Sequence, residues 1–188
     1  MKNFNNEKIL LSIVIFIALL LVAKTFKLPT TGTVDVSIMQ QKGAIATVDT
    51  VKKLSSTKHI LVDSINFLQS RTLQHPNLGK LGYSRNIFLN AKTQMSVLKS
   101  GEYIFLVSSD DGFRLKIDNK TVCEHPGDRP MKTTVCRVNL SKSDHFFNLM
   151  YFQGGGPMGL KVRYRLKGDS SLYYVGANSK YIKFKAVK

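Results

Sequence analysis

Apolar and polar residues alternate with a period of two along much of the chain after residue 33. In residues 34–38 three apolar side chains are separated by polar ones, and similar alternation recurs in residues 87–91, 113–118 and 160–166. Successive side chains of a strand point to opposite faces, so each of these segments predicts a half-buried β-strand.

Other segments rich in β-branched and aromatic residues also predict strands, namely 59–67, 102–107, 133–140, 145–152 and 181–187. Residues 102–107 are almost continuously apolar, which is typical of a central strand covered on both faces. Turn-forming Asp, Asn, Gly and Pro residues separate the strands. Many short strands with such spacing predict an all-β fold, an antiparallel β-sandwich or barrel. Residues 48–54 fit either a short helix or an irregular connection.

A different pattern occupies the N-terminal part of the chain, where residues 9–23 contain no charged side chain. Fifteen helical residues reach about 22 Å, which is short of a hydrocarbon core of about 30 Å. Extending the segment to Leu28 gives about 20 residues, with Lys24 and Lys27 reaching back to the interface. A cleaved signal peptide and an uncleaved signal anchor both fit, and the lack of a good small-x-small cleavage site favours the anchor.

The expected organisation has three parts. Residues 1–28 form a cytoplasmic tail and a transmembrane signal anchor, residues 29–33 a linker, and residues 34–188 the β-sandwich domain. Basic residues flank the apolar segment in equal numbers, so the positive-inside rule does not set its orientation. A short tail ahead of a large domain favours a single-pass cell-membrane protein whose C-terminal domain is periplasmic or extracellular.

The charge of the chain is strongly positive, since 28 Lys and Arg residues against 12 Asp and Glu give a net charge of +16. Such a charge predicts attraction to anionic polymers or membrane surfaces. Basic residues alternate along three predicted strands: Arg114, Lys116, Lys161, Arg163, Arg165, Lys183 and Lys185. If those strands are neighbours, these side chains form one broad basic face. Otherwise they are the solvated outer side of a sandwich.

The two cysteines of the chain are Cys123 and Cys136. In an oxidising compartment they are expected to form one disulfide that closes a small loop. The expectation therefore depends on export of the domain.

Two motifs follow one another in the middle of the chain. Residues 109–112 read Ser-Asp-Asp-Gly at the end of one predicted strand, and residues 117–119 read Ile-Asp-Asn at the end of the next. Residues 145–165 then supply an aromatic strand, a glycine-rich loop and an alternating strand. This arrangement resembles the PA-14 domain family, a β-sandwich module named after the anthrax toxin protective antigen. The resemblance covers about residues 32–187, is strongest over 100–166, and implies a shared binding module.

The resemblance also implies a ligand site. In sugar-binding members of the family two adjacent Asp residues, often joined by a cis peptide bond, hold a Ca²⁺ ion shared with sugar hydroxyls. The corresponding residues are Asp110 and Asp111, and adjacent carboxylates do supply the hard oxygen ligands that Ca²⁺ prefers. Gln153 and the carbonyls of Gly154 and Gly155 are expected to complete the site. The alternative is a plain turn in which Asp caps the backbone and Gly takes a positive φ.

Catalytic motifs are lacking in the sequence, which contains no nucleophile elbow, no HExxH and no phosphate loop. We therefore expect a non-catalytic, membrane-anchored, exported binding domain that recognises a glycan or envelope polymer or docks neighbouring envelope proteins, with no nucleic-acid partner. The alternative is a structural subunit of a multi-protein cell-envelope assembly, such as a secretion, pilus or motor complex, that uses the basic face for protein contacts and is oligomeric within that complex.

Overall fold

The computed structural model describes residues 11–16 and 32–187, and residues 11–16 are helical. No helix in these two ranges combines the length and the apolar character needed to cross a membrane. The span predicted within residues 1–28 and the linker predicted at 29–33 fall largely outside the described residues, so both stay predictions.

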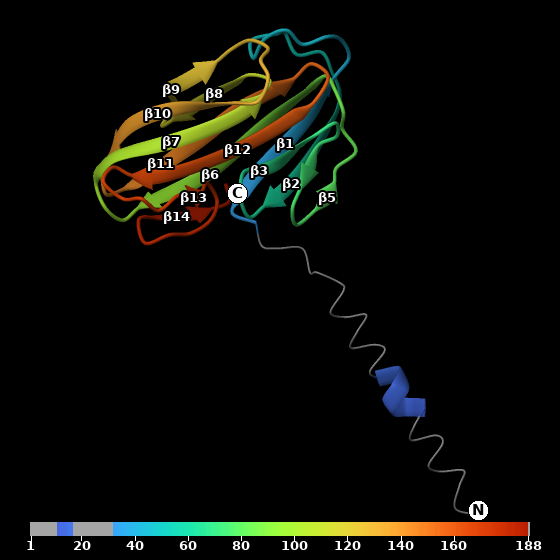
Figure 1. Ribbon diagram of the computed structural model, residues 1–188, viewed down its shortest axis with the longest axis horizontal. Coiled ribbons are helices and arrows are strands. Elements are labelled where there is room, and N and C mark those ends of the chain that lie inside the picture. The colour runs from blue at the N-terminus through green and yellow to red at the C-terminus, as the bar shows by residue number, and fades with distance from the viewer. Residues whose placement is uncertain (1–10, 17–31, 188) are drawn as a thin grey trace, which may run out of the picture. The chain divides into compact units, whose positions relative to one another are not determined.

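Residues 32–187 form two antiparallel sheets that face each other, with a small hairpin at one side (Figure 1). The seven-stranded sheet has the order β2 (Leu54–Val62), β1 (Val34–Gln41), β6 (Ile87–Val97), β11 (Asp144–Gln153), β8 (Phe113–Ile117) and β9 (Lys120–His125), and β14 (Ile182–Lys185) also pairs with β6. The five-stranded sheet has the order β10 (Lys132–Leu140), β7 (Gly101–Asp110), β12 (Met158–Leu166) and β13 (Tyr173–Tyr174), and β3 (Asn66–Ser70) also pairs with β12. The hairpin consists of β4 (Gln74–His75) and β5 (Gly79–Lys80).

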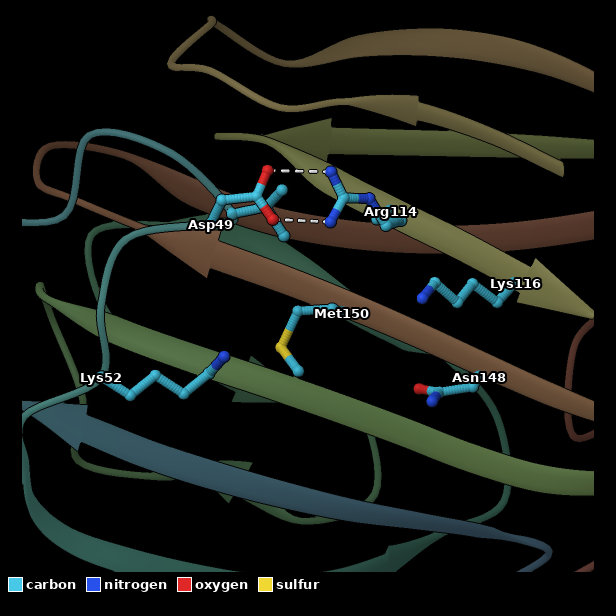
Figure 2. Close-up of a pocket in the computed structure, with 7 residues that line it drawn as sticks. Asp49, Lys52, Arg114, Lys116, Asn148 and Met150 are labelled. Carbon is cyan, nitrogen blue, oxygen red and sulfur yellow. Dashed lines mark hydrogen bonds and ion pairs between the residues drawn. The ribbon is translucent and has the colours of Figure 1, made fainter. Parts of the chain in front are cut away.

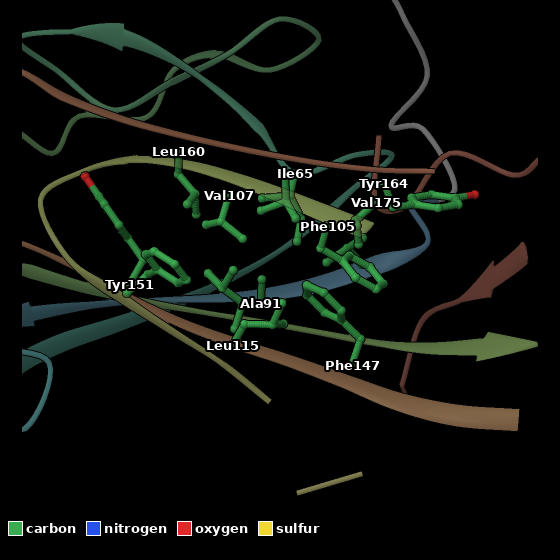
Figure 3. Close-up of a cluster of buried hydrophobic side chains, with 14 of the residues drawn as sticks. Ile65, Ala91, Phe105, Val107, Leu115, Phe147, Tyr151, Leu160, Tyr164 and Val175 are labelled. Carbon is green, nitrogen blue, oxygen red and sulfur yellow. The ribbon is translucent and has the colours of Figure 1, made fainter. Parts of the chain in front are cut away.

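The hydrophobic core fills the space between the two sheets, because each strand turns every second side chain inward (Figure 3). Phe105 of β7 lies with its ring centroid 6.1 Å from that of Phe147 in β11 and 5.9 Å from that of Tyr164 in β12. All three side chains are fully buried. Each large buried side chain contributes about 1.5–3 kcal/mol, so this layer is the main stabilising feature of the domain.

The prediction of one continuous strand over residues 59–67 is wrong, because two strands occupy this range. β2 ends at Val62 and β3 begins at Asn66, and the bend between them carries the chain from the seven-stranded to the five-stranded sheet. Residues 48–53 form an irregular connection and not a helix. Its Val48 packs with Phe88 and Phe152 in a second, smaller cluster on the outer side of the seven-stranded sheet. The largely polar β9 was missed because its side chains lack a regular apolar alternation.

Cys123 in β9 and Cys136 in β10 are joined by a disulfide, with Cα atoms 5.7 Å apart. β9 is an edge strand of one sheet and β10 an edge strand of the other. The bond therefore links the two layers along one side of the sandwich.

Candidate functional site

The two Asp residues of the Ser-Asp-Asp-Gly motif lie where the chain crosses between sheets. β7 ends at Asp110, and β8 of the other sheet begins at Phe113. Asp110 and Asp111 are joined by a cis peptide bond, and they are only 6% and 3% exposed. The carboxylates thus lie at one rim of the sandwich and are largely removed from water.

Gly112 allows a second loop to approach this turn closely. A Cβ atom at this position would lie 2.5 Å from the carbonyl oxygens of both His125 and Gly127, which a real side chain cannot tolerate. The absence of a side chain therefore lets the loop after β9 pack on the turn. That loop carries Asp128, and it brings this third carboxyl group to Asp111.

Burial and neighbouring carboxyl groups hinder the ionisation of Asp110 and Asp111. Burial, a hydrogen bond with Asp128 and the negative charges of Asp128 and Asp110 raise the pKa of Asp111 to about 7, although the amide of Gly154 opposes the change. Burial also raises the pKa of Asp110, against a hydrogen bond from the backbone amide of Met131. Crowded carboxylates resist ionisation, and a cation placed among them would remove that resistance.

One backbone hydrogen bond ties the glycine-rich loop to the carboxylate turn, and the side chain of Gln153 holds the loop in place. The amide of Gly154 donates to Oδ2 of Asp111 over 2.8 Å. The buried side chain of Gln153 donates from Nε2 to the carbonyl oxygens of Gly155 (2.8 Å) and Pro157 (2.9 Å). Its Oε1 accepts from the hydroxyl of Tyr151, which also lies within hydrogen-bond distance of the carbonyl oxygen of Asp110. Both polar atoms of the Gln153 side chain, Nε2 and Oε1, are therefore hydrogen-bonded within the protein.

The comparisons with known proteins agree with this architecture. The family model described as the PA14 domain matches residues 84–179, just over half of the chain. The chain belongs to the PA14 domain family. No curated protein matches the chain by sequence.

Three solved structures show how widely this PA14 fold is shared. The chain is similar to a "PA14 sugar-binding domain from RTX adhesin" at 17% identity and a TM-score of 0.59, over 74% of this chain and 93% of that one. It is similar to the Epithelial Adhesin 6 A domain from Candida glabrata in complex with Galb1-3GlcNAc at 11% identity and a TM-score of 0.57, over 85% and 89%. It is also similar to an anti-sigma factor domain-containing protein from Clostridium clariflavum at 18% identity and a TM-score of 0.59, over 82% of this chain and 47% of that one.

The donor set of the PA14 turn suits a hard cation such as Ca²⁺. Asp110 and Asp111 provide carboxylate oxygens at the rim, and Asp128 lies in hydrogen-bond contact with Asp111. Within residues 11–16 and 32–187, however, no three His, Cys, Asp or Glu side chains are arranged to hold a metal by themselves. A bound Ca²⁺ would therefore take its remaining oxygens from backbone carbonyls, water or ligand hydroxyls.

Arg129 is a basic neighbour of this acidic group. Its guanidinium donates to Oγ of Ser109 (2.8 Å) and to Oγ1 of Thr134 (2.9 Å), and it stacks 5.4 Å from the ring centroid of Phe113. Burial lowers the pKa of Arg129, while the charge of Asp110 raises it. The guanidinium offsets part of the negative charge at Asp110.

The condition for a single basic face, that the three basic strands are neighbours, is not met. Arg114 and Lys116 lie on β8, and Lys183 and Lys185 on β14, all in the seven-stranded sheet. The remaining three residues, Lys161, Arg163 and Arg165, lie on β12 in the five-stranded sheet. The alternation correctly predicts that these side chains point away from the core. Because their strands belong to different sheets, however, the side chains lie on opposite sides of the sandwich.

Two residues of the site were missed by the sequence analysis, namely Asp128 and Arg129. The turn residues Pro126, Gly127 and Asp128 are recognisable in the sequence, but nothing local in them indicates a contact with Asp111. The pairing needs the close approach at Gly112, which is a tertiary feature.

Proposed function

We propose that this chain is an exported, membrane-anchored, non-catalytic module whose PA14 domain binds a glycan at the Asp110–Asp111 turn through Ca²⁺. The observation that carries the proposal is the group of carboxyl groups at this rim, where Asp111 is crowded by Asp110 and Asp128. Charges held together at such cost are typical of a binding site and not of a plain turn.

Each residue of the proposed site has a separate role in binding. Asp110 and Asp111 would hold the ion, and Asp128 would add negative charge beside it. Bound Ca²⁺ would supply coordination positions for vicinal sugar hydroxyls. Gln153 positions the loop of Gly154 and Gly155, whose backbone borders the ligand. The printed descriptions of the similar adhesin domains, sugar-binding in one and complexed with Galb1-3GlcNAc in another, support a glycan over a protein ligand.

The membrane anchor is supported by the apolar residues 9–23, which contain no charged side chain. Together with the residues up to Leu28 they form a segment of about 20 residues, the length that a helix needs to cross a hydrocarbon core of about 30 Å.

Calorimetric titration of the full chain with Ca²⁺, followed by a glycan array with and without chelator, tests the proposal. We expect Ca²⁺ uptake by the wild type, loss of uptake in Asp111→Asn, and glycan binding that chelator abolishes. A wild type that takes up no Ca²⁺ and binds no glycan would contradict the proposal.

The alternative function, a structural subunit of an envelope assembly, is favoured by one observation. The Nε atoms of Arg163 and Arg165 are buried and have no hydrogen-bond partner within the described part of the chain. Arg163 and Arg165 lie beside Leu106 and Ile104 of β7 on the outer side of the five-stranded sheet. An acidic neighbour would satisfy these groups. Pull-down from solubilised membranes, with Arg163→Gln/Arg165→Gln as the comparison, tests it, and a wild type that runs as a lone monomer in mild detergent argues against it.

A further inference from the structure

A second polar pocket lies on the outer side of the seven-stranded sheet, between the irregular connection before β2 and strands β8 and β11 (Figure 2). Its volume is about 170 Å³, and the residues that matter for its chemistry are Asp49, Lys52, Arg114, Lys116, Asn148 and Met150. None of the residues proposed to hold Ca²⁺ lines it.

One wall of the pocket is a rigid ion-pair group. Arg114 donates from its two terminal nitrogens to the two carboxylate oxygens of Asp49, over 2.6 and 2.9 Å, and from Nε to Glu124. Bidentate pairing of this kind fixes both side chains. Hydrogen bonding to Arg114 lowers the pKa of Asp49, and the nearby charges of Lys52 and Lys116 lower it further. Two carboxylates therefore neutralise the guanidinium. Arg114 holds Asp49 and Glu124 in place and is not available to bind an anion.

The two lysines of the pocket lack such compensation. Neither Lys52 nor Lys116 forms an ion pair with any described carboxylate. Lys52 Nζ lies 4.8 Å from the ring centroid of Phe88, which holds the ammonium group over the sheet. Figure 2 shows the polar ends of Lys52, Lys116 and Asn148 directed into the same space. Two ammonium groups are thus available there for an anion.

An unpaired amide oxygen in the pocket wall independently points to a ligand site. The Oδ1 atom of Asn148 is buried and has no hydrogen-bond partner among the described residues. The same holds for Oδ1 of Asn90, which lies outside the pocket lining. These residues lie on adjacent strands, since Asn148 of β11 pairs with Lys92 and Met150 pairs with Asn90. Buried polar atoms without partners are uncommon in folded proteins, and ligands or ordered water usually satisfy them. A ligand in this pocket would meet both charged and neutral hydrogen-bonding groups.

We infer that this pocket is a subsite for the anionic substituent, carboxylate or sulfate, of an acidic saccharide. Lys52 and Lys116 bind the oxyanion, Asn148 bonds a ring hydroxyl, and the thioether of Met150 contacts the apolar side of the ring. The small volume suits one sugar ring or its charged substituent, not the length of a polymer. The choice of a saccharide rests on the proposed function, whereas the anion site rests on the pocket itself.

The pocket lies near the carboxylate turn, because the connection that lines the pocket contacts the loop that precedes Asp128. Val48 donates its amide hydrogen to the carbonyl oxygen of Pro126 over 2.8 Å, and Thr47 forms a β-bridge with Gly127. The connection that carries Asp49 and Lys52 therefore packs on the loop that carries Asp128. Arg114 follows Asp111 by three residues, about 10 Å along an extended chain.

Saturation-transfer NMR on the full chain in mild detergent, with chelator present throughout, tests the inference. D-glucuronate and D-glucose differ in the carboxylate and are titrated in parallel, and inorganic sulfate is added as a competitor. We expect binding of glucuronate, no binding of glucose, and displacement of glucuronate by sulfate. Lys52→Gln/Lys116→Gln should weaken glucuronate binding about tenfold or more, as expected for lost charge-assisted hydrogen bonds.

The matched control is Lys183→Gln/Lys185→Gln, which removes the same charge from the same sheet at exposed positions of β14. We expect the control to bind glucuronate as the wild type does. Equal binding of glucose and glucuronate, or equal losses in the two double variants, would overturn the inference. In Asp111→Asn we expect Ca²⁺-dependent glycan binding to be lost and glucuronate binding at Lys52 and Lys116 to persist. A wild type that binds glucuronate but shows no Ca²⁺-dependent glycan binding contradicts only the proposed function, and a wild type with the reverse behaviour contradicts only the inference about the pocket.

Discussion

The backbone amide of Gly154 donates a hydrogen bond to Oδ2 of Asp111, although 43 positions of sequence separate the two residues. This bond connects the glycine-rich loop after β11 to the carboxylate turn after β7. The loop and the turn therefore form one site, and a change in either one alters the position of the other.

The raised pKa of Asp111 makes stability depend on pH when no Ca²⁺ is bound. The folded value is about 7 against an ordinary 3.8, so the unfolded chain releases this proton first as the pH rises. The free energy of unfolding should fall between about pH 4 and pH 7, by about 1–2 kcal/mol after allowance for solvent screening. The substitution Asp111→Asn should remove this decrease in the free energy of unfolding. The variant should therefore be more stable than the wild type at pH 8 but not at pH 4.

Urea unfolding at pH 4 and pH 8 with chelator measures this effect. Asp35→Asn, on the outer side of β1, is a control that also removes one carboxylate. The interpretation fails if Asp111→Asn changes the free energy of unfolding equally at both pH values. Added Ca²⁺ should stabilise the wild type at pH 8 and leave Asp111→Asn unchanged, because a ligand stabilises the state that binds it.

Gln153→Ala should destabilise the domain and loosen the glycine-rich loop. The substitution removes the side-chain donor to the carbonyl oxygens of Gly155 and Pro157, and it removes one of the two hydrogen-bond partners of the buried Tyr151 hydroxyl. We expect a loss of about 2–3 kcal/mol in the free energy of unfolding, measured by denaturant titration. Gln69→Ala, at an exposed position of β3, should change it by less than about 0.5 kcal/mol. Similar losses in both variants would argue against this role of Gln153.

Reduction of the disulfide should weaken the contact between the two sheets. Cys123 and Cys136 are 13 positions apart, and a loop of this length gives about 3 kcal/mol of stabilisation. Cys123→Ala/Cys136→Ala should therefore unfold at a lower temperature than the oxidised wild type, and a reductant should lower the wild-type melting temperature toward that of the variant. A reductant that shifts the variant as much as the wild type would show that the bond is not the cause.

Membrane association should depend on the apolar residues 9–23. The full chain should stay with the membrane fraction after alkaline carbonate extraction, and a variant lacking residues 9–23 should not. Substituting three of these residues by Lys should have the same effect as the deletion, because charges in the middle of a span oppose insertion. Release of the full chain by carbonate alone would refute the anchor.

Much of the fold follows from local patterns. Alternation predicts β1, β8 and β12 and correctly assigns Val36, Leu115 and Tyr164 to the core. The Ser-Asp-Asp-Gly and Ile-Asp-Asn motifs, together with the aromatic strand and glycine-rich loop of residues 145–165, indicate the family, and the first motif marks the turn of Asp110 and Asp111 because its residues are consecutive. The two cysteines could be proposed as a pair because the sequence offers no other partner.

Other features are decided only in the tertiary structure, because alternation assigns a side chain to a face but says nothing about which sheet its strand joins. Arg114 and Arg163 show the same alternation, yet they lie on opposite sides of the sandwich. Asp128 joins Asp111, and Lys52 faces Lys116, only because loops distant in sequence pack at the rim and over the outer side of the seven-stranded sheet. Contacts of this kind depend on strand pairing across long sequence separations, and no local pattern records them.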